Sequence, residues 1–234
     1  MAAALLSVSA LHANYGESHV LHGVDCHVDR GEVVTLLGRN GAGRTTTLRA
    51  LLGLVGARSG SVLIDGRETI GLPTHRIARL GVGYCPEERG IYSSLSTQEN
   101  LLLPPPVAPG GMSVEQIYAM FPNLEARRAS RGTHLSGGEQ QMLALARILR
   151  TGARLLLLDE ISEGLAPVIV QALSRTVRLL RDQGYTIVMV EQNFHFAAPL
   201  ADRFYIMERG RIVAGFDAGE LQDRMSLVHQ YLGV

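Results

Sequence analysis

The chain has 234 residues, of which 46% are hydrophobic, and its 22 basic side chains balance 22 acidic ones. That length predicts one globular unit with a sizeable core, and a zero net charge gives no broad attraction to nucleic acid or anionic lipid. The longest apolar runs are of strand length, far below the roughly 20 residues that cross a bilayer. We therefore expect a soluble protein that spans no membrane and has no nucleic acid as its main partner.

The start of the chain and its cysteines indicate a reducing compartment. The opening Met-Ala-Ala-Ala-Leu-Leu is mildly apolar but lacks a basic segment, so a signal peptide is not expected. Cys26 and Cys85 stand far apart without a C-x-x-C pattern, which argues against a disulfide framework. These features predict a cytoplasmic location.

Short β-rich runs joined by Gly-rich turns alternate with helical patterns, which predicts an α/β core. Asp65-Gly66 and Arg209-Gly210 are typical of turns, the second between two strands of a hairpin. The runs 155–158 and 187–190 are apolar at every position, which indicates strands buried on both faces of a parallel sheet. Residues 218–231 have the pattern of an amphipathic terminal helix. The expected strands are 5–10, 33–37, 62–64, 82–85, 155–158, 186–190 and 204–207.

The composition shifts between about residues 87 and 151. A breaker-rich stretch at 104–111 contains the runs Pro-Pro-Pro and Pro-Gly-Gly, and it precedes helical patterns near 113–121 and 139–149. This shift predicts a small helical subdomain inserted in an α/β core. The expected division is a core of 1–86 and 152–234 and a helical subdomain of 87–151.

A glycine-rich segment follows the expected strand 33–37 and precedes a helical run, which is the context of a P-loop. The glycines let successive backbone N–H groups point inward, and the helix N-terminus adds partial positive charge where phosphates sit. A plain glycine-rich turn would not explain the spacing of the glycines or Thr45 in the magnesium-ligand position. The expected phosphate-binding residues are Gly38, Arg39, Asn40, Gly41, Ala42, Gly43, Arg44, Thr45 and Thr46.

Arg44 stands where the P-loop pattern has lysine. Lysine acts there as a compact point charge, whereas guanidinium is longer, planar and forked, so the replacement is not conservative in geometry. Losing a well-placed charged hydrogen bond costs roughly 1.5–3 kcal/mol, or about one to two decades in rate. We therefore hypothesise that ATP binds through backbone amides and magnesium while turnover is impaired.

The string Leu-Ser-Gly-Gly-Glu-Gln-Gln at 135–141 opens a helical pattern. Ser136 and Glu139 stand at the spacing of a capping box, which explains these two residues as an ordinary helix start. Helical glycine costs roughly 1 kcal/mol relative to alanine. Close approach of a phosphate to Gly137 and Gly138 is the explanation that accounts for the glycine pair.

This string and the P-loop together resemble ABC-type nucleotide-binding domains. In that family the motif of one subunit covers the γ-phosphate that the P-loop of the other subunit holds. The resemblance implies an ATPase with a P-loop core, an antiparallel β subdomain and an inserted helical subdomain. It also implies a second ABC ATPase subunit, identical or related, as a partner. Ser136, Gly137, Gly138 and Glu139 are the residues expected at the partner's nucleotide.

Two carboxylates, Asp159 and Glu160, follow the buried run 155–158. A charged turn after a strand is the plain alternative. By the resemblance, Asp159 holds Mg²⁺ together with the Thr45 hydroxyl, and Glu160 orients and polarises the attacking water. ATP and Mg²⁺ are therefore the expected cofactors.

Four further residues take places that the resemblance implies for the site. Tyr15 resembles the aromatic residue that stacks on adenine and Val20 its apolar companion, although an isolated tyrosine would equally be core or surface. Glu87 stands where many relatives have a glutamine that touches Mg²⁺ and water, and a carboxylate also binds magnesium. Gln192 stands where most relatives have a histidine that senses the γ-phosphate; glutamine carries no proton near neutral pH.

The loop 162–167 takes the place of the segment that contacts the opposite subunit in this family. Ile161 and Glu163 replace residues that are usually proline and an apolar side chain. The resemblance implies the contact with the second subunit, and the two departures change its fine packing.

Several strings resemble the subfamily that imports branched-chain amino acids and related amides. This resemblance implies a location on the inner face of the cell membrane and integral membrane permease subunits as partners. Residues 91–95 resemble the groove that receives a permease helix, and they equally fit a subdomain core. Two alternatives stay open: a weakly hydrolysing subunit paired with an active partner ATPase, and a soluble ABC ATPase acting on DNA or ribosomes. The strings are 73–82, 86–87, 164–167, 190–193 and 231–234.

Overall fold

The computed structural model describes residues 4–233, and its strands form two sheets. Residues 1–3, which open the segment weighed as a signal peptide, and Val234 lie outside the described residues. One sheet is antiparallel in the order β2-β1-β4-β5, and the other has the order β10-β9-β3-β8-β7-β6. The strands are β1 Leu6–Tyr15, β2 Ser18–Val28, β3 Val33–Leu37, β4 Ala57–Ile64, β5 Arg67–Glu68, β6 Val82–Cys85, β7 Leu155–Asp159, β8 Thr186–Glu191, β9 Arg203–Glu208 and β10 Arg211–Asp217.

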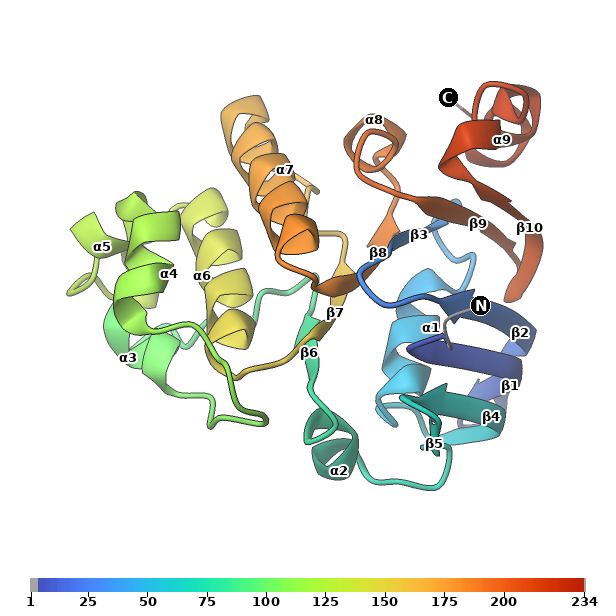
Figure 1. Ribbon diagram of the computed structural model, residues 1–234, viewed down its shortest axis with the longest axis horizontal. Coiled ribbons are helices and arrows are strands. Elements are labelled where there is room, and N and C mark those ends of the chain that lie inside the picture. The colour runs from blue at the N-terminus through green and yellow to red at the C-terminus, as the bar shows by residue number, and fades with distance from the viewer. Residues whose placement is uncertain (1–3, 234) are drawn as a thin grey trace.

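The helices divide into those near the sheets and a group at the opposite side of the molecule. In Figure 1, α3, α4, α5 and α6 gather on the left, whereas α1 lies on the right beside the antiparallel sheet. Within residues 4–233, no helix combines the length and apolar character needed to cross a membrane. The helices are α1 Arg44–Leu51, α2 Thr74–Ala78, α3 Thr97–Leu102, α4 Val114–Met120, α5 Pro122–Ala126, α6 Gly137–Arg150, α7 Pro167–Asp182, α8 Phe194–Ala197 and α9 Met225–Leu232, with 3-10 turns at Gly132–His134 and Ala218–Glu220.

The larger sheet has parallel pairing through its centre. Strands β3, β7 and β8 are buried at every position, which confirms the expectation of strands covered on both faces. Both β3–β8 and β7–β8 pair in parallel, so their carboxyl ends meet at one edge. The P-loop and the pair Asp159–Glu160 follow two of these strands. The topology therefore brings them to the same edge of the sheet.

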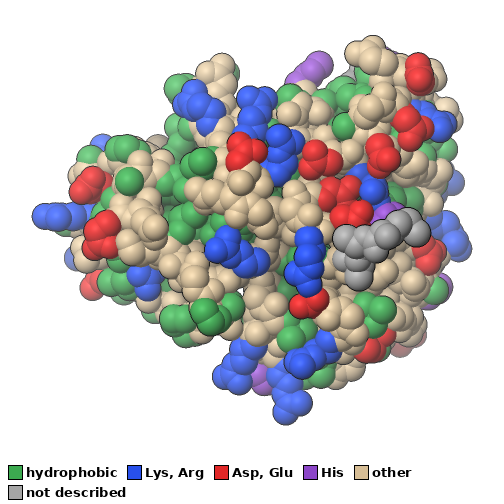
Figure 2. All heavy atoms as spheres, in the orientation of Figure 1, with side chains coloured by type: hydrophobic (Ala, Val, Ile, Leu, Met, Phe, Trp, Pro, Cys, Tyr) green, Lys and Arg blue, Asp and Glu red, His purple; other side chains and the backbone are tan. Residues whose placement is uncertain are grey.

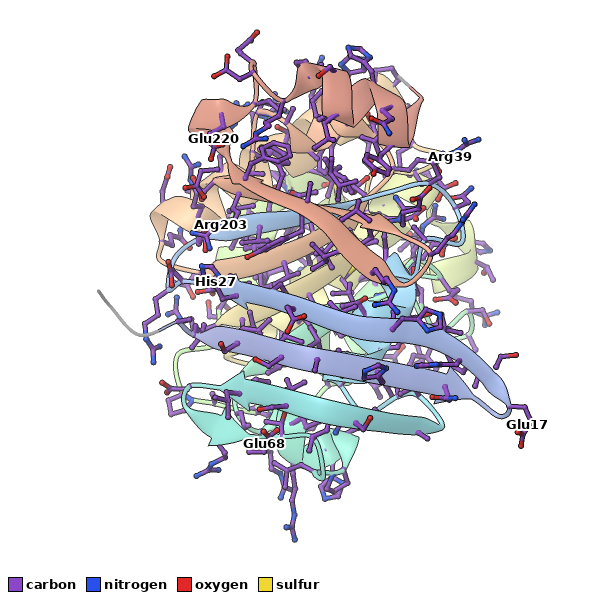
Figure 3. The ribbon with its side chains drawn as sticks, turned by 90° about the vertical axis from the view of Figure 1, so that its right-hand side faces the viewer. Glu17, His27, Arg39, Glu68, Arg203 and Glu220 are labelled. Atoms are coloured by element: carbon purple, nitrogen blue, oxygen red, sulfur yellow. The ribbon has the colours of Figure 1, made fainter. Side chains whose placement is uncertain are left out.

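A hydrophobic core fills the space between the two sheets and includes α1. Leu48 and Leu51 of α1 share this core with Val34 and Leu36 of β3 and with Leu11 of β1. Figure 3 shows β2, β1 and β4 running side by side, with the β9–β10 hairpin beyond them. The antiparallel sheet thus covers the helix that follows the P-loop.

A second core joins the other face of the parallel sheet to the helices. Leu143 and Leu145 of α6 share it with Cys85 of β6 and Leu156 of β7. Helix α6 therefore packs directly on the sheet rather than on the helices alone. The division into 1–86 with 152–234 and 87–151 stays a prediction.

The surface carries charges of both signs. Figure 2 shows acidic and basic side chains interspersed over the visible face, in keeping with the equal numbers of the two in the sequence. Apolar side chains also reach this face, most densely over the helical group at the left of the view. Mixed charge of this kind gives the visible face no broad attraction to a polyanion.

The two expected turns have the geometry that the sequence predicts. Asp65 and Gly66 have φ values of 51° and 71°, and Arg209 and Gly210 have φ values of 46° and 73°. Positive φ at both central residues is typical of a two-residue hairpin turn of type I′. The first turn joins β4 to β5, and the second joins β9 to β10, as expected for the second.

Three expectations about elements need correction. Residues 218–231 do not form one helix, because a 3-10 turn capped by Asp217 ends before α9 begins at Met225. Strand β1 continues to Tyr15, five residues past the expected end, and pairs with β2, which was not predicted. Helix α7 was also missed, although Leu173, Val177 and Leu180 are buried at helical spacing.

Candidate nucleotide-binding site

The loop 38–46 leaves β3 and enters α1 along a path that needs glycine. Gly41 and Gly43 have φ values of 79° and 105°, in the left-handed region. Gly210 supports the loop from the β9–β10 turn, because its amide donates to the Ala42 carbonyl at 2.8 Å. Its own carbonyl accepts from the His22 amide of β2 at 2.9 Å. The hairpin turn therefore holds both the loop and the strand beside it.

A cavity of about 360 Å³ opens above this loop. It unites most of the predicted P-loop residues with Val20 and with the acidic residues that follow β6 and β7. The N-terminus of α1 lies at the cavity, which adds partial positive charge for a phosphate. The lining residues are Val20, Asn40, Gly41, Ala42, Gly43, Arg44, Thr45, Thr46, Glu87, Glu160 and Glu163.

Other predicted residues lie outside this lining. Gly38 sits beneath the loop, where a Cβ would lie 2.6 Å from the Met207 carbonyl oxygen. Arg39 is exposed, and Tyr15 ends β1 with 40% of its surface accessible. Gln192 is exposed and lines a neighbouring cavity of about 600 Å³. Glu160 lines both cavities and connects them.

Asp159 is fully buried, and both of its carboxylate oxygens accept hydrogen bonds. Thr45 Oγ1 donates to Oδ1 at 2.9 Å, and the Tyr84 hydroxyl donates to Oδ2 at 2.9 Å. Burial raises the pKa of Asp159, and the bonds from Tyr84 and Thr45 oppose that rise. A hydroxyl and a carboxylate oxygen side by side are hard ligands of the kind magnesium prefers. Tyr84 was not predicted, because sequence does not reveal which residue of β6 faces Asp159.

Arg44 forms an ion pair with Glu160 across the cavity. Its Nη2 lies 2.7 Å from Glu160 Oε1, and the two side chains are only 4% and 9% exposed. Nη2 also donates to Asn40 Oδ1 at 3.3 Å, whereas Nη1 is buried without a hydrogen-bond partner among residues 4–233. The sequence contains no lysine, so every side-chain cation except histidine is a guanidinium. The residue that departs from the P-loop pattern thus contacts the candidate catalytic carboxylate directly.

Glu160 stands in a strained and crowded position. Its φ is 47°, a left-handed conformation that side chains rarely adopt and that is concentrated at functional sites. Its amide donates to the Val190 carbonyl at 2.9 Å. Burial raises the pKa of Glu160 to about 7, with Glu163 adding to the rise and Arg44 opposing it. A carboxyl with a pKa near 7 is poised for proton transfer at neutral pH.

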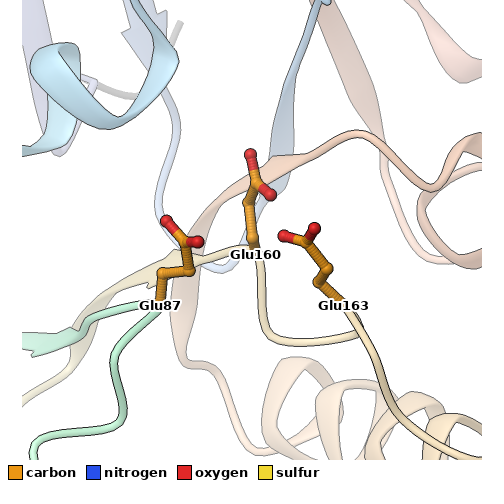
Figure 4. A group of neighbouring side chains, drawn as sticks. All are labelled: Glu87, Glu160 and Glu163. Atoms are coloured by element: carbon orange, nitrogen blue, oxygen red, sulfur yellow. The ribbon is translucent and has the colours of Figure 1, made fainter. Parts of the chain in front are cut away.

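Glu87, from the segment after β6, meets Glu160 and Glu163, which share the loop after β7 (Figure 4). One oxygen of each lies within 4.8 Å of an oxygen of the others. Burial and the nearby Glu163 charge raise the pKa of Glu87. Glu163 was not among the predicted site residues, since the resemblance suggested only an interface role for its loop. The predicted magnesium ligand Glu87 stands in this group, and Thr45 and Asp159 lie beside it.

The string 135–141 forms the start of α6 and does not line the cavity of its own chain. Ser136 and Glu139 form the capping box: Glu139 N donates to Ser136 Oγ at 3.3 Å, and Ser136 N donates to Glu139 Oε2 at 2.7 Å. A Cβ on Gly138 would lie 2.8 Å from Ile169 of α7. Internal packing alone therefore requires glycine at 138, and the sequence argument from phosphate approach is not needed for that residue.

Sequence comparison decides the family. The sequence model described as "ABC transporter" matches residues 21–163, more than half of the chain. The chain belongs to the ABC transporter family. It is therefore an ABC-type ATPase, and this family binds ATP.

Two curated relatives of this ABC ATPase match over nearly their full lengths. The high-affinity branched-chain amino acid transport ATP-binding protein BraG of Pseudomonas aeruginosa is 40% identical over 238 aligned positions, covering 98% of this chain and 100% of that protein. The lipopolysaccharide export system ATP-binding protein LptB of Escherichia coli is 33% identical over 237 positions, covering 98% of each. A protein of branched-chain amino acid transport and a protein of a lipopolysaccharide export system thus both stand among the similar proteins.

Solved structures confirm the expected ABC-type α/β fold. An ATP-binding subunit of an ABC transporter is 29% identical and superposes with a TM-score of 0.80, covering 98% of this chain and 96% of that one. A dimeric bacterial ABC transporter cassette superposes with a TM-score of 0.79 at 22% identity, covering 91% and 98%, and shows the shared fold alone.

Proposed function

We propose that this ABC ATPase is the ATP-binding subunit of an importer and hydrolyses Mg-ATP to power uptake of branched-chain amino acids or related amides. One observation carries the chemistry. The P-loop cavity, the Thr45–Asp159 pair and Glu160 meet at the carboxyl edge of the parallel sheet. The cargo class rests on BraG and on a "Probable branched-chain amino acid transport ATP-binding protein", LivF of Archaeoglobus fulgidus, which is 32% identical over 234 positions.

The residues divide the work by their chemistry. Loop amides of 38–46 bind phosphate oxygens, while Tyr15 and Val20 hold the base. Magnesium fits Thr45, Asp159 and Glu87, because Thr45 and Glu87 line the cavity with hydroxyl and carboxylate oxygens and the buried Asp159 accepts the hydrogen bond of the Thr45 hydroxyl. When bound, it supplies positive charge that stabilises the transferring phosphoryl group.

Glu160 is the base that takes up the proton of the attacking water, since its raised pKa suits proton transfer near neutral pH. Gln192 stands at the adjoining cavity and gives a hydrogen bond to the terminal phosphate. Glu160 lines both cavities, so these two roles meet at one carboxylate.

The site requires a second subunit under this proposal. Ser136, Gly137, Gly138 and Glu139 lie on α6, away from the cavity of their own chain, so they cap the nucleotide of a partner copy or related subunit. Support comes from the dimeric cassette of the same fold. The same proposal places the assembly on permease subunits at the inner face of the membrane, with residues 91–95 as the contact. Tyr92 in that segment is 53% exposed.

A Glu160→Gln variant tests the chemistry. The amide keeps the size of the side chain but cannot accept the proton, so we expect retained binding of Mg-ATP and loss of phosphate release. Glu17→Gln, on the exposed β1–β2 turn, is the matched control and should hydrolyse ATP like the parent. Unchanged phosphate release by Glu160→Gln would remove Glu160 from the mechanism.

A second candidate function is energising lipopolysaccharide export, which the 33% identity to LptB favours. Deleting the gene in cells that encode this chain and measuring uptake of labelled leucine separates the two. Lost uptake, restored by the intact gene, supports import. Normal uptake together with permeases of an export system in the affinity-purified complex would support export instead. A weakly hydrolysing subunit would co-purify with a second, more active ABC ATPase.

A further inference from the structure

The Arg44–Glu160 ion pair occupies the cavity in which phosphates are proposed to bind. Among residues 4–233, Arg44 is the one cationic side chain in the cavity lining, which also holds Glu87, Glu160 and Glu163. Both members of the pair are more than nine-tenths buried. Charged hydrogen bonds are worth about twice neutral ones, and a buried charge left without its partner is strongly unfavourable. An anion that enters the cavity therefore competes with the Glu160 carboxylate for the Arg44 guanidinium.

The fork of the guanidinium allows such an exchange. Nη2 is engaged by Glu160 and Asn40, whereas Nη1 is buried and has no acceptor in the described part of the chain. A buried donor without an acceptor favours the arrival of an oxygen. Nη1 is therefore a second donor on the same guanidinium that a phosphate oxygen can use when Nη2 exchanges the carboxylate for phosphate. A lysine ammonium is a single point charge on a different stem and lacks this planar pair of donors.

We propose that Arg44 and Glu160 form a nucleotide-operated latch. In the empty protein Arg44 holds Glu160, and an entering nucleotide draws the guanidinium onto its phosphates and frees the carboxylate to act as the base. This inference rests on the proposed function, because it assigns a positioning role to Arg44 within the same site. It also gives the arginine at this position a task that differs from simple phosphate binding.

The latch makes phosphate and Glu160 competitors for one cation, so weakening the Glu160 side must strengthen nucleotide binding. Glu160→Gln removes the negative charge that pairs with Arg44 and leaves only a weaker hydrogen bond from the guanidinium to a neutral amide, which corresponds to about a tenfold gain in nucleotide affinity. The gain must depend on Arg44. In an Arg44→Lys background we expect less than about a twofold change, because the ion pair is no longer in the arrangement that the fork provides.

Isothermal titration calorimetry of four proteins tests the latch: the parent, Glu160→Gln, Arg44→Lys and the double variant. The ligands are Mg-ADP and a non-hydrolysable ATP analogue with Mg²⁺, so that arrested turnover cannot imitate tighter binding. Glu163→Gln is the matched control, since it removes one negative charge from the same cavity without contacting Arg44 in the structure. The increase in nucleotide affinity of Glu163→Gln measures the effect of removing any one negative charge from the cavity. It should be smaller than the increase in affinity of Glu160→Gln.

Equal gains from Glu160→Gln in the parent and in the Arg44→Lys background would overturn the latch, as would a Glu163→Gln gain as large as that of Glu160→Gln. Thermal melting of each variant checks folding, and Arg44→Gln replaces Arg44→Lys in the cycle if the lysine variant melts early. Failure of the parent to bind either nucleotide would instead contradict the proposed function itself. Nucleotide binding with additive effects of the two substitutions contradicts the latch alone.

Discussion

Ser162 donates two hydrogen bonds to Glu191, from its amide at 3.2 Å and from Oγ at 2.8 Å. Glu191 ends β8, and Ser162 lies two residues after Glu160, whose amide donates to the neighbouring Val190 carbonyl at 2.9 Å. The loop that carries Glu160 is thus fastened to the strand end that carries Gln192. We therefore expect Glu160 and Gln192 to move together.

The buried Glu191 predicts that stability falls as pH rises above about 4.5. Burial raises the pKa of Glu191 from 4.5 to about 8, with the Ser162 bonds opposing the rise. The folded protein therefore holds a proton that the unfolded chain has released between these values, and the free energy of unfolding decreases by up to about 1.4 kcal/mol per pH unit. Denaturant unfolding at pH 5 to 8 should show this slope, and Glu191→Gln should flatten it. An equal slope in both proteins would contradict the assignment.

The pH dependence of hydrolysis reports Glu160. Because the base form of a group with a pKa of about 7 increases with pH, kcat/KM for Mg-ATP should rise through neutral pH and then level off. Glu163 raises the pKa of Glu160 through a hydrogen bond and its charge. Glu163→Gln should therefore move the midpoint to lower pH. Phosphate release measured from about pH 5.5 to 9 checks this shift, and an unmoved midpoint would show that Glu160 does not govern the profile.

Arg44→Lys should raise the rate of ATP hydrolysis. Lysine restores the compact charge of the P-loop pattern, and recovery of one charged hydrogen bond in the transition state corresponds to about one to two decades in kcat. Steady-state phosphate release at saturating Mg-ATP measures the change. Arg30→Lys is the control, because Arg30 lies on the surface in an exposed ion pair with Asp65. Equal rates for Arg44→Lys and the parent would refute the idea that Arg44 impairs turnover.

Gly138→Ala should destabilise the protein even without nucleotide. Its Cβ would lie 2.8–3.0 Å from three side-chain atoms of Ile169. Overpacking of this kind costs about 1–3 kcal/mol, against a helix-propensity gain of about 1 kcal/mol. Unfolding in urea measures the loss, and Gly138→Ala should cost less in an Ile169→Ala background than in the parent, because the clash is then absent. Gly137→Ala is the comparison, since only the flexible end of Arg89 lies near, at 3.2 Å. If Gly138→Ala is as stable as the parent, packing against Ile169 does not require glycine at 138, and the approach of a nucleotide is the remaining explanation.

Sequence predicts those parts of the site whose conformation depends on residues that are neighbours in the chain. Strands β3 and β6 have the predicted bounds, and the loop 38–46 follows from glycines that must accept left-handed backbone. Strand β2 was missed at a register shift next to Gly23, which interrupts its alternation. The alternation of the apolar Val24, Cys26 and Val28, all of them buried, with polar residues at 25 and 27 was a sequence signal that could have found it.

The contacts that sequence did not predict depend on register between distant strands. Tyr84 meets Asp159 because β6 pairs with β7, and the pairing register is not written in either strand alone. The Arg44–Glu160 bond joins residues 116 positions apart, so the motif pattern gave each a role without revealing their contact. Glu163 meets Glu87 because the strands that precede them, β7 and β6, are paired.

The turn residue Gly210 sets a limit on how the nucleotide can be gripped. Its backbone is bonded on one side to Ala42 of the phosphate loop and on the other to His22 of the strand carrying Val20. A Cβ at 210 would lie 1.9 Å from the Val20 carbonyl oxygen, so the β9–β10 turn packs tightly against the backbone of β2. The strand that carries Val20 and the loop 38–46 are consequently held together as one rigid part. Under the proposed function, closure around a bound nucleotide therefore comes from the opposite side of the cavity, where Glu87, Glu160 and Glu163 lie.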